Sequence, residues 1–247
     1  MIDTFELTKK FGKFTAVNEL SIKVSTGEVF GLLGPNGAGK TTTIKLLAGL
    51  LKPTSGRALI GGYDIQKHPV EARKILSYVP DMPFLYDKLE PMEFMLFIGQ
   101  LYGMEPAGVA RASDELFEVF GLDEIRRQTI ESLSHGTRQR LVIASALLHQ
   151  PKVIIIDEPM VGLDPRSARV VKNALKERSR AGATVFLSTH VLHIAEELAD
   201  QVGILNRGRL IAVGTIDELR EVSGQKGELE DAFLALTRGE EAAAEIP

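Results

Sequence analysis

The sequence predicts an α/β fold: a mainly parallel sheet covered by helices, an antiparallel β subdomain at the N-terminus, and an inserted α-helical subdomain. Short apolar runs at residues 153–156 and 184–187 are typical of strands buried on both faces. Such runs alternate with helical patterns, which favours parallel strands joined by helices. Between residues 81 and 148 strand-like runs are absent and helical periodicity takes over.

The composition restricts the classes of protein to consider. With 247 residues, 44% of them hydrophobic, the chain can bury a sizeable core. A net charge of −4 argues against a nucleic-acid partner. The absence of cysteine excludes disulfides and thiolate metal sites and suits a reducing compartment. No signal peptide is recognisable and no apolar run approaches the roughly 18–20 residues of a spanning helix, so we expect no direct membrane span.

The first eighty residues are predominantly strand-like. The expected strands are residues 2–7, 19–24, 28–33, 57–60 and 77–79, with a short helix at 69–76. A tight turn at Thr26-Gly27 predicts antiparallel pairing of the two strands that flank it. Pro80 ends the last of these strands.

The remainder of the chain is mostly helical, with strands between the helices. The expected helices are residues 92–102, 111–120, 138–148, 164–180 and 191–199, and the expected strands are 153–156, 184–187, 201–205 and 209–213. Gly121 is a candidate C-cap, and Asp164-Pro165 an N-cap with its first helical residue. A capping box at Thr215 begins a last small helix, and the acidic, Ala-rich end from Gly239 is expected to be disordered.

A phosphate-binding loop is predicted between the strand at 28–33 and the helix that follows it. Gly34, four further residues and then Gly39-Lys40-Thr41 fit the P-loop pattern in the strand–loop–helix context that the pattern requires. Glycines let backbone N–H groups turn toward an anion, and the helix adds its positive N-terminal end. Lys40 would reach the outer phosphates, and the Thr41 hydroxyl would reach Mg²⁺. A Gly-rich turn with a surface lysine is the alternative.

Two adjacent carboxylates follow the buried strand at 153–156. Asp157 ends this strand, at the edge of the sheet where ligands bind in such folds, and Glu158 is the next residue. Asp157 could hold Mg²⁺ directly or through water, and Glu158 would stand near an attacking water. A solvated strand end is the alternative reading of this pair.

Five segments, in this order, resemble a known family. They read Gly34-Pro35-Asn36-Gly37-Ala38-Gly39-Lys40-Thr41-Thr42, Leu133-Ser134-His135-Gly136-Thr137, Ile154-Ile155-Ile156-Asp157-Glu158-Pro159, Gly162-Leu163-Asp164-Pro165 and Ser188-Thr189-His190. Over roughly residues 2–215 the chain is similar to the ATP-binding subunit of an ABC transporter. A P-loop alone is common to many NTPases, and the later segments narrow the resemblance to this superfamily.

The resemblance implies a site for ATP and Mg²⁺. The implied nucleotide-binding residues are Phe11, Gly34, Pro35, Asn36, Gly37, Ala38, Gly39, Lys40, Thr41, Thr42, Ser134, His135 and Gly136, and the implied metal ligands are Thr41, Asp81 and Asp157. Phe11 would stack on adenine, although an exposed loop or core position is the alternative. Ser134 and its neighbours would contact the γ-phosphate held by a second subunit, in a head-to-tail dimer. Ser134 could also be an ordinary helix N-cap.

The resemblance also implies the catalytic residues. Glu158 would orient or deprotonate the hydrolytic water, and His190 would contact the γ-phosphate. His190 follows the buried strand at 184–187, so it would lie at the same sheet edge as Asp157. A surface or capping histidine is the alternative. Asp164 belongs to the loop that links the two subunits' sites in the family and would also cap a helix.

Residues 1–247 are expected to form a single ABC ATPase domain. Residues 1–80 and 149–220 would contain the RecA-like P-loop NTPase core and the antiparallel β subdomain, 81–148 the helical subdomain, and 221–247 a small C-terminal helix and a disordered tail. Three positions depart from the family pattern. Asp81 stands where glutamine is usual, His135 where glycine is usual, and Val161 where a small polar residue is commoner.

The leading hypothesis is a subunit that hydrolyses ATP to power transport, with export favoured, on the cytoplasmic face of the cell membrane. Its partners would be a second ATP-binding subunit and a separate transmembrane permease. A soluble ABC ATPase of translation or DNA maintenance is one alternative, but it predicts a second P-loop or a long coiled coil and a basic surface. A regulatory subunit that binds ATP with little turnover is the other alternative.

Overall fold

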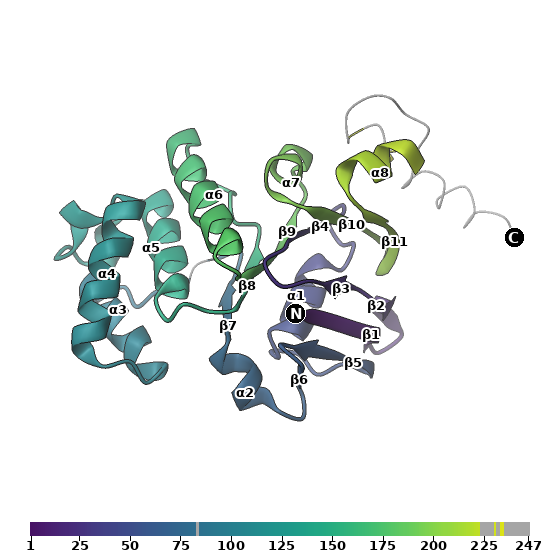
Figure 1. The fold of residues 1–247 in the computed structure, drawn as a ribbon, viewed down its shortest axis with the longest axis horizontal. Coiled ribbons are helices and arrows are strands. Elements are labelled where there is room, and N and C mark those ends of the chain that lie inside the picture. The colour runs from purple at the N-terminus through teal and green to yellow at the C-terminus, as the bar shows by residue number, and fades with distance from the viewer. Residues whose placement is uncertain (83, 223–229, 231–232, 235–247) are drawn as a thin grey trace, which may run out of the picture.

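Two β-sheets and a group of inserted helices make up the molecule (Figure 1). The structure, a computed structural model, describes residues 1–82, 84–222, 230 and 233–234. Most of the segment 221–247, including the tail predicted from Gly239, therefore lies outside the described residues. None of the described helices combines the length and apolar character needed to cross a membrane.

The larger sheet has six strands and is parallel except at one edge. Its order is β11 (Arg209–Gly214), β10 (Gln201–Asn206), β4 (Val29–Leu33), β9 (Thr184–Thr189), β8 (Val153–Asp157) and β7 (Leu76–Val79). Only the pair β10–β11 is antiparallel, a hairpin that the sequence predicts. Strands β4, β8 and β9 are buried at every residue, which agrees with a sheet covered on both faces.

The smaller sheet is antiparallel and lies at the N-terminal side. It contains β1 (Ile2–Phe11), β2 (Phe14–Leu20), β3 (Lys23–Val24), β5 (Ser55–Ile60) and β6 (Tyr63–Asp64). Strands β2, β3 and β5 pair with β1, and β6 pairs with β5. The predicted antiparallel β subdomain is therefore present.

One predicted strand pairing is wrong. The turn at Thr26-Gly27 exists, with Gly27 at φ +73°, but the chain changes sheets there. Strand β3 pairs with β1, whereas β4 pairs in parallel with β9 and β10. The reason is burial: β4 is apolar on both faces and is accommodated in the sheet that is covered on both sides. The predicted strand at 19–24 is also interrupted after Leu20.

Helices cover both faces of the large sheet. They are α1 (Lys40–Leu47), α2 (Pro69–Lys74), α3 (Pro91–Leu101), α4 (Pro106–Phe120), α5 (His135–Leu147), α6 (Pro165–Arg180), α7 (Leu192–Leu198) and α8 (Ile216–Val222), with 3₁₀ turns η1 (Asp123–Ile125) and η2 (Ile130–Ser132). Helix α1 lies between the two sheets, and α6 and α7 lie on the opposite face of the large sheet (Figure 1). The fold class that the sequence predicts is confirmed.

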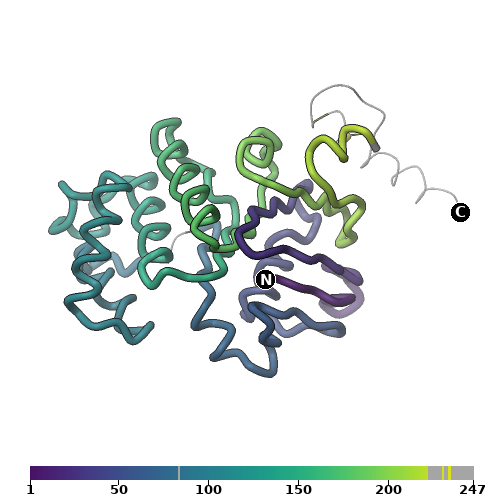
Figure 2. The backbone as a smooth tube through the Cα atoms, in the orientation of Figure 1, coloured from purple at the N-terminus to yellow at the C-terminus, as the bar shows by residue number. Residues whose placement is uncertain are grey.

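The inserted helices form a separate lobe. The tube in Figure 2 leaves the core after β7, passes through α3, α4 and α5, and returns to the core at β8. Since β7 and β8 are parallel neighbours, the insert is an excursion between two adjacent strands. Its amphipathic helix α4 ends at Gly121, a left-handed C-cap at φ +60° that the sequence predicts.

Separate apolar clusters hold these layers together. One joins the insert to the sheet through buried residues that include Phe117, Ile143 and Ile156. The other large cluster fills the space around α1 between the two sheets, where the rings of Phe30 and Phe186 stack with centroids 5.3 Å apart. Burying one such ring contributes about 1.5–3 kcal/mol, so the central strands are fixed firmly in place. The loops at their carboxyl ends are built on this rigid base.

Candidate nucleotide-binding site

The P-loop connects β4 to α1, and its backbone requires glycine at specific positions. Gly37 and Gly39 have φ of +81° and +106°, values that side chains disfavour. A Cβ on Gly39 would lie 2.3 Å from the Ala16 carbonyl oxygen, and one on Gly34 would lie 2.3 Å from that of Leu205. The loop can therefore approach both sheets only because these positions carry no side chain.

Lys40, the first residue of α1, is buried beside this loop. Its Nζ donates hydrogen bonds to the carbonyl oxygens of Gly34 at 2.7 Å and Pro35 at 3.2 Å. Burial lowers the pKa of Lys40, while the nearby charges of Glu158 and Asp157 oppose this effect. The ammonium group is thus held at the loop, where the negative charge of an anion can attract it away from the neutral carbonyl oxygens.

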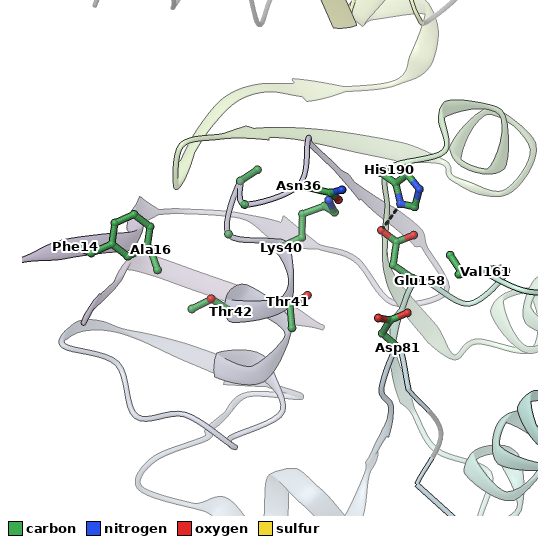
Figure 3. Close-up of a pocket in the computed structure, with 13 residues that line it drawn as sticks. Phe14, Ala16, Asn36, Lys40, Thr41, Thr42, Asp81, Glu158, Val161 and His190 are labelled. Carbon is green, nitrogen blue, oxygen red and sulfur yellow. Dashed lines mark hydrogen bonds and ion pairs between the residues drawn. The ribbon is translucent and has the colours of Figure 1, made fainter. Parts of the chain in front are cut away.

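A cavity of about 420 Å³ lies over the loop (Figure 3). It is lined by Phe14, Ala16, Asn36, Gly37, Ala38, Gly39, Lys40, Thr41, Thr42, Asp81, Glu158, Val161 and His190. Phe14 and Ala16 lie on one side of the P-loop, and Asp81, Glu158 and His190 lie on the other. The volume is in the range of small-molecule sites. One end is aromatic, the centre offers the Lys40 ammonium group and the N–H groups of the loop, and the other end carries the carboxylates of Asp81 and Glu158.

Asp157 ends β8 and is almost fully buried, with an exposed fraction of 1%. Its Oδ1 accepts a hydrogen bond from the Ser188 hydroxyl of the neighbouring strand β9. Its Oδ2 is buried without a hydrogen-bond partner among the described residues. An unpaired buried carboxylate oxygen is costly unless a cation or donor reaches it. This orphaned atom, close to the P-loop, fits the one or two carboxylates with which Mg²⁺ is usually held beside phosphates.

Glu158 takes an uncommon backbone conformation that aims its side chain into the cavity. Its φ is +50°, and its amide donates to the Ser188 carbonyl oxygen at 3.1 Å. Oε1 is hydrogen-bonded to His190 Nδ1 at 2.8 Å, while Oε2 is buried without a partner in the described part of the chain. One oxygen of Glu158 therefore orients His190, and the other is available to a ligand.

Several predicted site residues meet at the carboxyl ends of β4, β8 and β9, as parallel pairing requires. Lys40, Asp81, Glu158 and His190 line one cavity, whereas Asp157 does not line it but lies close enough for its charge to act on Lys40. Gly34 and Pro35 do not line the cavity but hold Lys40. The chemical roles of these residues stay predictions.

Ser134, His135 and Gly136 do not line this cavity. Ser134 caps α5: its hydroxyl accepts from the Thr137 amide at 3.3 Å and is hydrogen-bonded to the Thr137 hydroxyl at 2.8 Å. The capping alternative is therefore correct for Ser134 in the isolated chain. Its predicted contact with a second subunit's nucleotide stays a prediction.

The aromatic end of the cavity is formed by Phe14, a residue that the sequence analysis did not single out. Phe14 lines the cavity and is 63% exposed, whereas Phe11 does not line it. The two residues are cross-strand partners at the tip of the β1–β2 hairpin, and Lys9 Nζ lies 5.1 Å from the centroid of the Phe11 ring. The predicted stacking of Phe11 stays a prediction. The sequence Phe11-Gly12-Lys13-Phe14, a short turn with an aromatic residue on each side, is the feature that could have indicated Phe14 as a second candidate.

A P-loop flanked by two carboxylates and a histidine, at the carboxyl edge of a parallel sheet, defines a nucleoside triphosphatase of the P-loop class. A family model described as "ABC transporter" matches residues 17–161. The chain therefore belongs to the ABC transporter family. It is an ABC nucleotide-binding domain and an ATPase, so the family and activity predicted from the sequence are confirmed.

Named relatives agree with this assignment. The chain is 38% identical over 219 residues to the "Linearmycin resistance ATP-binding protein LnrL" of Bacillus subtilis, covering 89% of this chain and 70% of that protein. It is 38% identical over 240 residues to the "Probable multidrug ABC transporter ATP-binding protein YbhF" of Escherichia coli, of which it spans 41%. A solved "ATP binding subunit of ABC transporter" superposes with a TM-score of 0.91 at 33% identity, covering 96% of this chain and 99% of that one.

Proposed function

We propose that this chain hydrolyses Mg-ATP in a head-to-tail dimer and thereby powers export through a separate transmembrane permease. The observation that carries the proposal is the meeting of Lys40, Glu158 and His190 around one cavity. A triphosphate site needs charge stabilisation, and hydrolysis additionally needs a group that orients water. In this proposal Lys40 would stabilise charge and Glu158 would orient the water.

The P-loop would bind the phosphates of ATP. Backbone N–H groups from Asn36 to Thr42 would surround the β-phosphate, and Lys40 would exchange its carbonyl partners for phosphate oxygens. Thr41, Asp157 and Asp81, the last two at or just after the ends of the neighbouring strands β8 and β7, would hold Mg²⁺. When bound, Mg²⁺ would neutralise part of the negative charge of the phosphates.

Glu158 would act on the water that attacks the γ-phosphorus. As the water oxygen bonds to phosphorus and the bond to the ADP oxygen breaks, the carboxylate takes the proton of the water. Because Nδ1 of His190 contacts Glu158, the opposite edge of the imidazole ring would face the γ-phosphate. Because His190 is held by the base itself, the two groups would act as one unit.

A second copy would complete the site. Ser134, His135 and Gly136 begin α5, a 13-residue helix whose N-terminus lies outside the cavity of its own chain. In a head-to-tail dimer this helix end would face the γ-phosphate bound to the partner, where its N–H groups favour an anion. Sequence resemblance supports this arrangement.

The permease would dock on the helical insert, at the cytoplasmic face of the membrane. A small apolar groove between the insert and β7 is lined by Tyr78, Phe84, Phe94, Ile98 and Tyr102, among other residues. Phe84 at the groove is 84% exposed, and a partner helix would cover it. The names of the relatives, one for resistance and one for multidrug transport, support export.

ATP turnover by the wild type and by Glu158→Gln tests the proposal. We expect the variant to retain ATP binding, to lose hydrolysis by roughly 10²–10⁴-fold, and to accumulate a long-lived ATP-bound dimer. Turnover by phosphate release and dimer lifetime by size-exclusion chromatography are the measurements. Absence of turnover in the wild type with its membrane partner present would refute the ATPase cycle. A variant dimer that dissociates as fast as that of the wild type would show that Glu158 is not the base.

A further inference from the structure

His135, which stands where the family pattern has glycine, contacts a loop of its own chain. A Cβ placed on Gly162 would lie 2.7 Å from His135 Nε2 and 2.8 Å from its Cδ2. The imidazole therefore occupies the space in which a side chain at residue 162 would begin. Gly162 itself has φ of +75°. A glycine at 162 and a ring at 135 are thus complementary in shape.

A second contact joins the same two segments. A Cβ on Gly136 would meet Leu163 Cδ2 at 3.7 Å, an ordinary van der Waals distance. Successive residues at the start of α5 thus face successive residues of the loop 161–164. Each segment is also the cap of a helix, because Ser134 caps α5 and Asp164 caps α6. The contact joins the N-terminal turns of two long helices.

The loop 161–164 is continuous with the catalytic end of the cavity. The Val161 amide donates to the Glu158 carbonyl oxygen at 3.3 Å, and the Leu163 amide donates to that of Met160, also at 3.3 Å. Val161 lines the nucleotide cavity beside Glu158 (Figure 3). A movement of the Glu158 backbone would therefore be transmitted to Gly162 through these two hydrogen-bonded turns.

We propose that His135 is a positioning residue that fixes the loop 161–164 against the Ser134 turn. The loop and the turn then move together, so the state of the cavity in one chain reaches the surface that its own α5 presents to a second copy. This role rests on the proposed dimer. The imidazole acts here through its flat ring, which packs against the space left by the missing side chain of Gly162.

Hydrogen–deuterium exchange of the full chain tests the contact without nucleotide. We expect His135→Gly to speed amide exchange in the segments 134–137 and 160–164, and His135→Phe, which keeps a flat ring, to leave it near the wild-type rate. Gly103→Ala is the matched control for the backbone strain that Gly162→Ala, used below, would introduce. Gly103 has φ of +72°, and nothing lies within 4 Å of its added Cβ. Unchanged exchange in His135→Gly would overturn the proposal, whatever the protein's turnover.

ATP turnover in a double-mutant cycle then tests the positioning role. We expect His135→Gly to lower kcat roughly ten-fold with KM changed less than about two-fold, and His135→Phe to restore kcat. Gly162→Ala displaces the imidazole in the wild type but meets empty space in His135→Gly, so its effect on kcat should be several-fold smaller there. Equal effects in both backgrounds, or His135→Phe as impaired as His135→Gly, would refute positioning by packing.

The two measurements separate this inference from the proposed function. If exchange responds as expected while the wild type with its membrane partner hydrolyses no ATP, the proposed function fails and the His135–Gly162 contact stands. If turnover is normal and exchange is insensitive to residue 135, the inference fails alone. If His135→Phe has normal exchange but low kcat, the ring nitrogens act in place of the packing, as a phosphate contact would require, and positioning is refuted.

Discussion

Protonation of His149 should destabilise the folded protein in mild acid. This residue follows α5, and its ring stacks on Tyr102 with centroids 3.5 Å apart and an interplanar angle of 10°. Burial lowers the pKa of His149 from 6.5 to about 4. Between these values the unfolded chain binds a proton that the folded protein excludes, so stability decreases as the pH falls from about 6.5 toward about 4.

The size of the effect follows from the same two values. A pKa difference of about 2.5 units at roughly 1.4 kcal/mol per unit sets a ceiling of about 3.5 kcal/mol. Because the side chain is only partly buried, solvent screening reduces this figure, and we expect about 1–2 kcal/mol. His149→Phe keeps a flat ring on Tyr102 and cannot be protonated. It should therefore lose less stability than the wild type on acidification.

Urea unfolding at about pH 7 and about pH 5 measures the difference. The free energy of unfolding should fall between these two conditions by about 1 kcal/mol more in the wild type than in His149→Phe. Substitution of His68, which is exposed, by Gln controls for removal of a histidine in general and should leave the acid sensitivity unchanged. Equal losses in the wild type and in His149→Phe would refute the assignment of the effect to this residue.

Further substitutions test the nucleotide cavity. Phe14→Ala should weaken ATP binding by about 1 kcal/mol, roughly five-fold, if the ring that lines the cavity contacts adenine, and Phe11→Ala should have the smaller effect; calorimetric titration with ATP compares them. The opposite order would restore Phe11 as the stacking residue. Lys40→Met should weaken ATP binding by roughly 10–100-fold through loss of charged hydrogen bonds, while thermal unfolding verifies that the variant is folded. Unchanged affinity would contradict phosphate binding by Lys40.

The sequence predicts the phosphate-binding loop well because its determinants are local. Glycines at 34 and 39 are required by backbone approaches within a few ångströms of the loop, and the strand and helix that flank it are adjacent in the chain. Asp157 and His190 could be placed at one edge because both follow fully apolar strands. Parallel pairing of such strands brings their ends together without any further information.

One wrong strand pairing and the features that the sequence did not predict concern choices made by the tertiary structure. The turn at Thr26-Gly27 was recognisable, but whether β4 would join the small sheet or the large one depended on which had room for a strand buried on both faces. The position of Phe14 depended on the register of the β1–β2 hairpin, which has shifts at Leu7 and Lys9. The packing of His135 against Gly162 joins the first turn of α5 to the loop before α6, and local spacing in the sequence gives no signal for it.

The segment that leads from the helical insert back into β8 is hydrogen-bonded on both sides, to the residue before β7 and to the first residue of β9. Lys152 donates its amide to the Ile75 carbonyl oxygen at 2.9 Å, and its own carbonyl accepts from the Thr184 amide at 2.8 Å. The outgoing connection instead begins at Pro80 and passes Asp81, which lines the nucleotide cavity. A rotation of the insert about the attachment at Lys152 would therefore move Asp81 relative to the P-loop and change the lining of the nucleotide cavity.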